Sequence, residues 1–571
     1  MRQLSGLDAG FLYIESEQTP MHVGSLTLYQ RPDDGGNFAR NVLEHIKNRL
    51  HLAPIFNQRL ALMPFDLGHP VWVEADALDF DYHFQTHSVA RGAKPGTQAA
   101  LEALVAGLHE PLLDRAQPLW QFHLIEGLSD DRVAFYAKVH HAALDGAAGV
   151  LLANALLDLG PVPRVVEPPT AHEKPKAPSR TSLLGSLFSN TFAQYAKLAR
   201  TLPGAVKRVA DVAMAKGVAG TIAATREFGR DLSAPKTPFN VSIEAKRRFA
   251  MCSLPLSDIR AISAACDATI NDVVMALCSG ALRRFLISLD ALPARSLIAA
   301  VPVSLRELGD QKMNNQVSMV PCSLGTDAKT AEKRLMAAKA AMGEIKGAMA
   351  KFKDLIPTDY PSLGAPWLIG GLATLAVKTK LADRLVMPAN LVISNVPGPK
   401  VPLYLAGAKM LGYFPLSIVV HGMALNITVH SYAGQLDFGL IACARAVADL
   451  TPLAQAIGAE HIELKALAAH RLLGPVAHSK NALHKEAPKK ATAKTPTPKP
   501  AEKVNTKQST AKKVVAKPQT TKQPGTATAA KASVKKAVSA TKVVATKVVV
   551  TKVAAKTGAS KTSISKPSIT K

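Results

Sequence analysis

The sequence predicts an α/β protein with two α/β units joined by a long connection and followed by a disordered basic tail. Three observations predict this organisation. Strand-like alternating runs occur among longer runs with helical periodicity, before residue 160 and again after residue 250. Residues 161–178 contain six prolines, which is typical of a linker. From about residue 476 the chain contains no aromatic residue, so that segment is not expected to form a packed core.

The first unit, residues 1–160, contains two predicted amphipathic helices and two predicted strands. The helices are expected over residues 38–50 and 97–108, and the strands over residues 71–73 and 133–139. Residues 133–139 alternate over seven positions, which predicts a strand with one buried face. An apolar helical run at residues 147–157 closes the unit.

Residues 161–249 are expected to form a linker and amphipathic crossover helices. Within residues 182–224, seven large apolar side chains fall roughly on one helical face, and lysine and arginine occupy other positions. Two interpretations stay open. The segment is either a helix that packs on the body of the protein or a basic amphipathic helix that lies on an anionic membrane or droplet surface.

The second unit, residues 250–475, has helices predicted over residues 257–265 and 270–289. Its strands are predicted over residues 297–303, 317–322, 391–394, 416–421, 424–430 and 438–443. Residues 410–436 lack charged side chains, but proline, glycine, asparagine and histidine interrupt them, so they are predicted to form two strands and a turn. Residues 360–377 are shorter than the roughly 20 residues of a spanning helix. No transmembrane segment is expected.

Most of the positive charge lies in the tail, residues 476–571. The chain has a formal net charge of +26, and from residue 480 onward 22 lysines and two glutamates contribute +20 of it. The body therefore carries only about +6. The tail is expected to be disordered. It either solubilises the protein and attracts lipid weakly, or it binds DNA non-specifically through electrostatic attraction.

Cysteine usage and the N-terminus indicate a cytoplasmic protein. The five cysteines are scattered and form no CxxC pair, which argues against a disulfide framework or a zinc site. The N-terminus has Asp8 among its first residues and no long apolar run, so no secretory signal is expected. An enzyme for lipid substrates would then reach a membrane or lipid droplet as a peripheral protein.

The strongest functional signal is the block HHAALDG at residues 140–146, directly after the strand predicted at 133–139. Adjacent side chains on a strand point to opposite faces, so His140 and His141 cannot do the same job. A neutral histidine, with a usual pKa near 6.5, suits a general base at cellular pH. The residues alone leave open which histidine is the base. The alternative is a buried structural histidine pair at a turn.

HHAALDG resembles the HHxxxDG signature of the acyl-CoA-dependent acyltransferases related to chloramphenicol acetyltransferase, which include the condensation domains of peptide synthetases. Eight further blocks resemble the bacterial wax ester synthase/diacylglycerol acyltransferase family and occur in its order. They are LSGLDA at residues 4–9, PMHVG at 20–24, PLLDR at 111–115, PLW at 118–120, TPFN at 237–240, NDVV at 271–274, VPVSLR at 301–306 and SNVPGP at 394–399. The chain departs from the family at Asn314 and Asn315, where a Gly-Asn pair is frequent, and in its tail.

The resemblance implies two chloramphenicol-acetyltransferase-like lobes with mixed sheets, flanking helices and a tunnel between them. It implies that His141 is the general base and that His140 supports it from the opposite face. Asp145 either orients His141, as in a triad, or forms a structural ion pair that fixes the loop. Arg306 and Arg59 are candidate partners for that ion pair.

Two further residues are candidate members of the site. Gly146 permits a backbone geometry or a close approach that a side chain would block. The resemblance places Asn271 and its neighbour Asp272 beside the active site, where Asn271 would hydrogen-bond the oxyanion or position the alcohol. The alternative is an ordinary helix N-cap. The SNVPGP block leaves a strand through a rigid turn, and it either lines the tunnel or is purely structural.

The expected activity is acyl-CoA-dependent O-acyl transfer that makes wax esters, triacylglycerol or both. A hydroxyl of a long-chain alcohol or diacylglycerol would attack the acyl thioester directly, because no GxSxG elbow is present and no cysteine adjoins the histidines. Acyl-CoA would enter as a substrate, bound by scattered basic groups, and neither a cofactor nor a metal is expected. The alternatives are a related acyltransferase with a carrier-bound acyl donor, and a non-catalytic protein that binds DNA or membranes through its tail.

Overall fold

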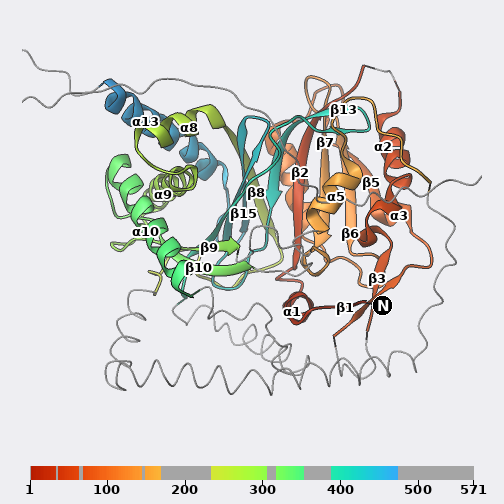
Figure 1. Cartoon of the computed structure of the whole chain (residues 1–571), viewed down its shortest axis with the longest axis horizontal. Helices are drawn as coiled ribbons and strands as arrows, with labels where there is room; N and C mark the ends of the chain where they lie inside the picture. The colour runs from red at the N-terminus through yellow and green to blue at the C-terminus, as the bar shows by residue number, and fades with distance from the viewer. Residues whose placement is uncertain are drawn as a thin grey trace, which may run out of the picture. The chain divides into compact units, whose positions relative to one another are not determined.

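Two six-stranded mixed sheets and one small sheet organise the computed structural model of the chain (Figure 1). The structure describes residues 2–33, 36–62, 69–144, 148–168, 233–304, 317–352 and 387–473. The small sheet has the order β1 (Arg2–Gln3), β4 (Val71–Glu74) and β3 (Gln58–Ala61). Two single-turn helices, η1 (Leu50–Leu52) and η2 (Pro54–Phe56), precede β3.

The first large sheet has the order β12-β13-β2-β7-β6-β5, and only its β5–β6 pair is parallel. Its strands are β12 (Tyr404–Leu405), β13 (Ala408–Leu416), β2 (His22–Gln30), β7 (Arg132–His140), β6 (Trp120–Glu126) and β5 (Phe84–Ser88). Because alternate side chains point to opposite faces of the sheet, each strand contributes side chains to the packing on both faces. One core cluster contains side chains from α1 (Gly6–Ile14), α2 (Phe38–Lys47) and α5 (Ala148–Leu156). Another contains side chains from α4 (Gln98–His109).

The second large sheet has the order β10-β9-β11-β14-β15-β8. Its strands are β10 (Val317–Ser323), β9 (Ile298–Ser304), β11 (Leu391–Val396), β14 (Leu425–Tyr432), β15 (Gln435–Cys443) and β8 (Arg247–Pro255). Its core is almost wholly apolar and includes side chains of the helices α8 (Leu256–Ala265), α9 (Ile270–Ser288), α10 (Ala331–Phe352) and α13 (Thr451–Leu473). The capping box of Thr269 and Asp272 begins α9.

Elements from both halves of the sequence join the two large sheets. β13, from the C-terminal half, pairs antiparallel with β2, and Leu416 lies opposite Gly24. On β8, an edge strand, two backbone N–H groups are bonded by carboxylates from the first half. Glu102 of α4 accepts from Met251 at 3.0 Å, and Glu110 accepts from Arg247 at 2.9 Å. These bonds satisfy an edge that would otherwise be open.

The predicted fold class is confirmed, and most predicted elements lie within a few residues of observed ones. The strand predicted at 416–421 is wrong, because β13 ends at Leu416. The alternating buried and exposed pattern begins at Ala408, whereas residues 417–421 form a loop whose Val420 makes a single bridge to Met423. Residues 410–436 contain the end of β13, all of β14 and the first residues of β15.

Several expectations fall on residues that the structure does not describe, namely the helix at 182–224, the stretch at 360–377 and the tail. The proposed domain boundaries stay a prediction. Among the described helices, none is by itself long and apolar enough to cross a membrane. The pair α8 and α9 passes that test together, although it bends by 102°, and most of α9 is buried in the second core.

Candidate active site

The histidine pair lies where β7 ends. His140 is the last residue of β7, and His141 begins the single-turn helix η4 (His141–Ala143). The N–H of His140 donates to Leu119 O at 3.0 Å, and the N–H of His141 donates to Met21 O at 2.8 Å. The backbone of each histidine is therefore bonded to a different neighbouring segment, which fixes the two side chains in different surroundings.

His140 is fully buried and both of its ring nitrogens are engaged. Its Nδ1 accepts from the N–H of Ala142 at 3.0 Å, so the ring proton belongs on Nε2. Nε2 lies 3.1 Å from Glu15 Oε1 and donates to it. These two bonds fix both the tautomer and the ring orientation, and they leave His140 no lone pair for a substrate.

Glu15 connects the end of α1 to the histidine pair. Its Oε1 also accepts from the N–H of Met21 at 3.1 Å, and its Oε2 lies 2.8 Å from Nη2 of Arg115. Burial by itself would raise the pKa of Glu15, but the hydrogen bonds from His140, Arg115 and the Met21 N–H hold that pKa at about 2. The carboxylate is thus ionised at neutral pH and is shared by α1, β7 and the PLLDR segment.

The surroundings of His141 are different. Its side chain is half-buried and stacks on the ring of Phe11, with centroids 4.0 Å apart and planes inclined by 22°. Burial lowers the pKa of His141 to about 4, a hydrogen bond to its own backbone raises it, and His140 lowers it further. Among the described residues, no other residue bonds its buried Nδ1. The imidazole is therefore neutral at cellular pH and can accept a proton.

Buried polar groups continue along the same sheet face as His140. His22 lies directly opposite His140 on β2, and its Nε2 hydrogen-bonds the carbonyl of His109 at 2.6 Å. Lys138 donates to the carbonyls of Leu108 and Pro111, at 3.0 and 2.6 Å, at the end of α4. Burial lowers the pKa of Lys138 to about 7 and that of His22 well below its usual range. His22 is therefore neutral at neutral pH, and Lys138 is about half protonated.

The glycine of the PMHVG block has a steric role on this face. A Cβ atom at Gly24 would lie 2.5 Å from Cε2 of Tyr136, so only glycine lets the tyrosine ring cross β2 here. The hydroxyl of Tyr136 lies 2.6 Å from Nδ1 of His109. In the PMHVG block, the Met21 carbonyl accepts the His141 N–H, and His22 lies opposite His140 on the sheet. Its glycine leaves space for the Tyr136 ring.

The PLW block supports the strand that carries the pair. Leu119 accepts the backbone N–H of His140, and Trp120 is completely buried. The indole N–H of Trp120 donates to Phe56 O at 3.2 Å, and its rings stack on His83 with centroids 4.1 Å apart. This packing fixes β6 and, through it, the end of β7.

Asn271 is the second residue of α9, and the suggestion that it is an ordinary N-cap is wrong. The cap is Thr269, whose hydroxyl accepts from the N–H of Asp272 at 3.2 Å. Asn271 Oδ1 instead accepts from Nδ2 of Asn395 at 3.2 Å. The structure therefore brings together the NDVV and SNVPGP blocks, which are far apart in the sequence. A role for Asn271 next to His141 stays a prediction.

The SNVPGP turn is closely packed. A Cβ atom at Gly398 would lie 1.9 Å from Cε1 of His430, and the Gly398 N–H donates to Ser431 Oγ at 3.1 Å. Asp145, Gly146 and Arg306 lie outside the described residues, so the partner of Asp145 stays a prediction. Arg59, the other candidate partner, lies on β3, 3.4 Å from the exposed carboxylate of Asp76.

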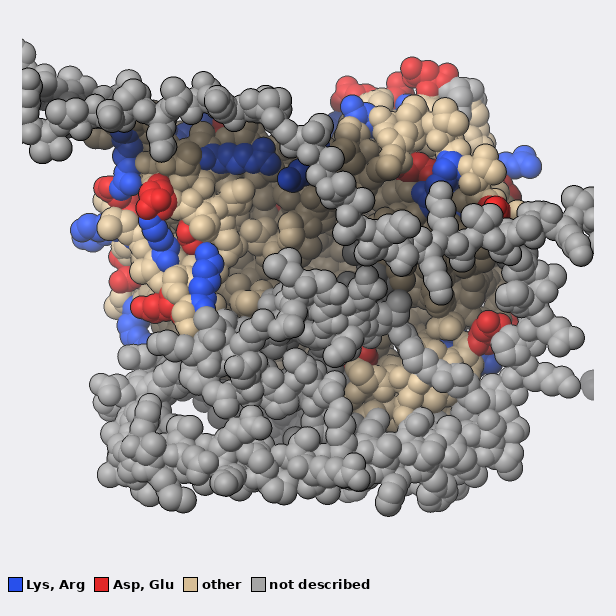
Figure 2. Space-filling view, viewed as in Figure 1, with Lys and Arg blue, Asp and Glu red and all other residues tan. Residues whose placement is uncertain are grey.

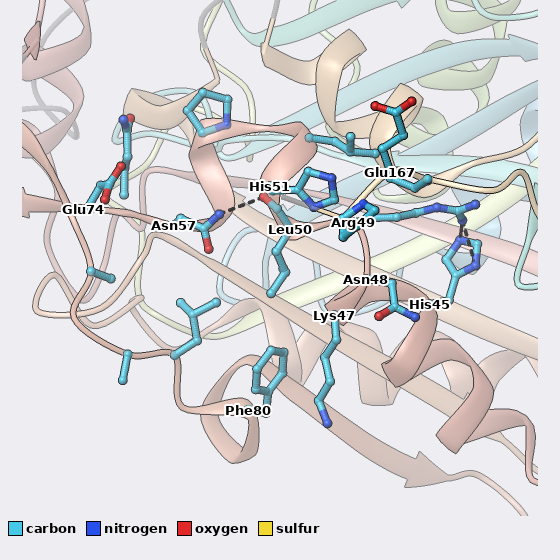
Figure 3. Close-up of a pocket in the computed structure, with 18 of the residues that line it drawn as sticks. His45, Lys47, Asn48, Arg49, Leu50, His51, Asn57, Glu74, Phe80 and Glu167 are labelled. Carbon is cyan, nitrogen blue, oxygen red and sulfur yellow. Dashed lines mark hydrogen bonds between the residues drawn. The ribbon is translucent and has the colours of Figure 1, made fainter. Parts of the chain in front are cut away.

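A groove lies between the end of α2, the η1–η2 turn and residues 163–168 (Figure 3). It is lined by Lys47, His51 and Arg49 together with acidic and apolar side chains, and none of the described residues of the histidine block, 140–144, lines it. Arg49 is buried and pairs with Asp158 at 3.0 Å. Within the described ranges, no group of three or more His, Cys, Asp or Glu side chains could hold a metal ion.

Sequence reasoning did not identify Phe11, Glu15 and Arg115 as parts of the site. Arg115 falls inside the PLLDR block, and Phe11 and Glu15 lie between two blocks that were recognised. A usable signal was present, because Glu15 follows an apolar helical run and precedes a buried strand. A carboxylate in such a place needs a partner.

The two lobes of mixed sheets, one of which carries the histidine pair at a strand end, have the predicted chloramphenicol-acetyltransferase-like fold. Family models for the wax ester synthase/diacylglycerol acyltransferase catalytic domain and the WS/DGAT C-terminal domain match residues 4–274 and 313–465. The chain belongs to this family, and it is an acyltransferase.

Individual relatives agree with this assignment. A Mycobacterium tuberculosis protein named "Probable diacyglycerol O-acyltransferase tgs2" is 36% identical over 453 residues, which cover 78% of this chain and 95% of that protein. A Mycobacterium bovis relative, also named as a diacylglycerol O-acyltransferase, is 38% identical over 467 residues, covering 80% and 89%. The solved wax ester synthase/diacylglycerol acyltransferase of Marinobacter aquaeolei is 32% identical, with a TM-score of 0.57, and covers 82% of this chain and 100% of that chain.

Proposed function

We propose that this acyltransferase moves a fatty acyl group from acyl-CoA to a long-chain alcohol or diacylglycerol, with His141 as the general base. The observation that carries the assignment of the base is the difference between the two histidines. Both nitrogens of His140 are used within the fold, whereas His141 is half-buried and neutral at cellular pH. The names of the relatives support the substrate class.

The reaction needs no covalent enzyme intermediate. The His141 imidazole takes the hydroxyl proton as the alcohol oxygen attacks the thioester carbonyl. The tetrahedral intermediate then collapses, the C–S bond breaks, and the imidazolium returns the proton to the CoA thiolate. Asn271 is the proposed hydrogen-bond donor to the oxyanion or the alcohol. Asp145 fixes the loop by an ion pair or orients His141, and Gly146 gives that loop its backbone freedom.

We also propose that the protein is cytoplasmic and meets its lipid substrates at a membrane or droplet surface. On the described part of the face in Figure 2, basic and acidic side chains are interspersed, which gives weak attraction to an anionic surface. The tail carries about +20, and each lysine near an anionic membrane contributes about 1 kcal/mol of attraction. Non-specific binding of the tail to DNA is the competing outcome.

The test of the proposed activity is a product assay with the full-length protein. Radiolabelled palmitoyl-CoA is offered hexadecanol and dioleoylglycerol in competition, and the wax ester, triacylglycerol and free palmitate are separated. Ester formation from free acyl-CoA is expected. If no ester forms with either acceptor although the protein is folded, the proposal is wrong. Ester formation only from a carrier-bound acyl group would support the rival donor.

A further inference from the structure

The helix α1 contacts both histidines of the pair through side chains four residues apart. Phe11 stacks on His141, and Glu15, which follows the last helical residue, bonds His140. Residues separated by four positions lie on the same side of a helix. One element therefore positions the reactive histidine and its supporting neighbour.

Both ends of α1 are fixed, so the position of Phe11 is defined. At the N-terminus, the Ser5 hydroxyl caps the helix by accepting from the N–H of Asp8 at 3.1 Å. Near the C-terminus, Arg115 donates to Leu12 O at 2.7 Å and to Glu15 at 2.8 Å. Because both ends of α1 are held by hydrogen bonds, the Phe11 ring loses little conformational entropy when it packs against the imidazole of His141.

We propose that Phe11 is a positioning residue that keeps water from His141 and the acyl thioester, so that the acyl group goes to the alcohol rather than to water. This inference rests on the proposed function and deepens it, because it assigns the choice between the two nucleophiles to a named side chain. The near-parallel rings, 4.0 Å apart, leave no space for a water molecule between them.

The competing reaction uses the same base. If water replaces the alcohol, its oxygen attacks the thioester carbonyl while His141 takes one of its protons. The C–S bond breaks, and the products are a free fatty acid and CoA thiol. The two nucleophiles differ in size and polarity, so an apolar ring over the base disfavours water, while the hydrocarbon chain of a lipid alcohol is compatible with it.

The burial of His141 is consistent with this role. Loss of the Phe11 ring would admit water to one face of the imidazole and move the pKa of His141 from about 4 towards its usual 6.5. Among the described residues, His140 on β7 is the titratable neighbour that acts on the pKa of His141, and it is bonded in turn to Glu15. Lys138, on the same sheet face as His140, has a pKa of about 7, so the pH profile of each variant is compared with that of wild type.

The test compares three variants with wild type. Phe11→Ala removes the ring, Phe11→Tyr retains an aromatic face, and Tyr13→Ala removes a half-buried ring from the same helix, where its hydroxyl bonds His69 at 2.7 Å. Each protein is given palmitoyl-CoA and hexadecanol between pH 5.5 and 7.5. Palmitate, ester and the rate of thiol release are measured, together with thermal midpoints.

Phe11→Ala is expected to raise the palmitate-to-ester ratio at least about threefold, because water then reaches the thioester. Its kcat/KM should fall about tenfold from pH 7.5 to 5.5, as for a base with a pKa near 6.5, while wild type changes little. Phe11→Tyr should restore both properties, and Tyr13→Ala should leave both at wild-type values even if it lowers the thermal midpoint.

Three outcomes would contradict the inference, the proposed function or both. If wild type makes ester and Phe11→Ala keeps the wild-type product ratio and pH profile, the role of Phe11 is wrong and the proposed function stands. Equal changes in Tyr13→Ala would also overturn the role, because they would indicate a general effect of loosening α1. If wild type makes no ester at all, the proposed function fails.

Discussion

The two large sheets differ in the kind of residue that they bury. One face of the first sheet places His22, Lys138 and His140 side by side, all almost completely buried. The second sheet adjoins a large apolar cluster, but it also buries Asp437 on β15, and a buried ion pair of Arg334 with Glu460 joins the helices α10 and α13. Buried polar groups are tolerated where hydrogen bonds satisfy them. In the first sheet they are histidines and a lysine beside the histidine pair, and in the second they include Asp437 on β15 and the ion pair that connects two helices.

The largest effect on activity is expected from His141→Ala. Loss of a general base costs about 10²–10⁴-fold in rate, and the fold should survive because the ring is only half-buried. His140→Ala should instead lower the thermal midpoint as well as the rate, because the buried carboxylate of Glu15 loses one of its three partners and keeps only Arg115 and the Met21 N–H. Initial rates and thermal melts measure both. The assignment of the base is wrong if His141→Ala keeps more than about a tenth of the wild-type rate while His140→Ala is inactive.

The largest effect on stability is expected from loss of the buried ion pair between α10 and α13, two helices of the second lobe. Arg334→Met leaves the buried Glu460 with only Arg284, 3.7 Å away, as a charged partner and should lower the free energy of unfolding by about 3 kcal/mol. The double variant with Glu460→Leu should recover most of that loss, because no charge remains buried. Urea unfolding measures stability. The folded single variant should keep the wild-type kcat, and a large drop in kcat would show that this lobe contributes to the chemistry directly.

A smaller effect on both properties is expected from Gly24→Ala. The new methyl group would lie 2.5 Å from the Tyr136 ring, and overpacking of this kind costs about 1–3 kcal/mol. Because Gly24 lies on the face that carries His140, activity should fall together with the thermal midpoint. Gly10→Ala is the matched control, since nothing lies within 4 Å of its Cβ position. It should be neutral or stabilising, and equal destabilisation by both changes would contradict the steric argument.

The smallest effect on turnover is expected from removal of the tail after residue 478. Activity on detergent-dispersed substrate should stay near the wild-type value, because every described residue of the site precedes the cut. Co-sedimentation with anionic vesicles should weaken, and the difference should shrink as salt is raised. Equal vesicle binding by both forms would remove the membrane role. Tight, salt-sensitive binding of duplex DNA by the full-length form would instead favour a nucleic-acid role.

The sequence predicted regular elements well where the side-chain period was unambiguous. The run at 133–139 corresponds to β7, although that strand is buried on both faces and not on one as predicted, and the apolar periodicity at 270–289 corresponds to α9. The strand at 416–421 was misplaced because an apolar run resembles a strand even when it is a loop. Neither pattern nor spacing indicates that β13 pairs with β2, since that pairing depends on packing between distant segments.

The site was predicted only in part, for a related reason. A strand end and a short motif identified His140 and His141. Glu15, Arg115 and Phe11 act through contacts that bring separate segments together, and local periodicity carries no information on such contacts. The alternative that Asn271 is the N-cap of α9 is wrong, and the sequence alone left it open because two polar residues, Thr269 and Asn271, lie close to the start of the helix and either type is common at a cap.

The pairing of β13 with β2 also constrains how the protein is made. Leu28 lies opposite Gly412, so the two strands are separated by about 380 residues of chain. Ribosomes add about 5–20 residues per second, and β2 therefore leaves the ribosome tens of seconds before its neighbour exists. During that interval the first sheet has an exposed strand edge, which is a site for pairing with other chains. Production of this enzyme should therefore benefit from chaperones that hold nascent chains and from slow expression at low temperature.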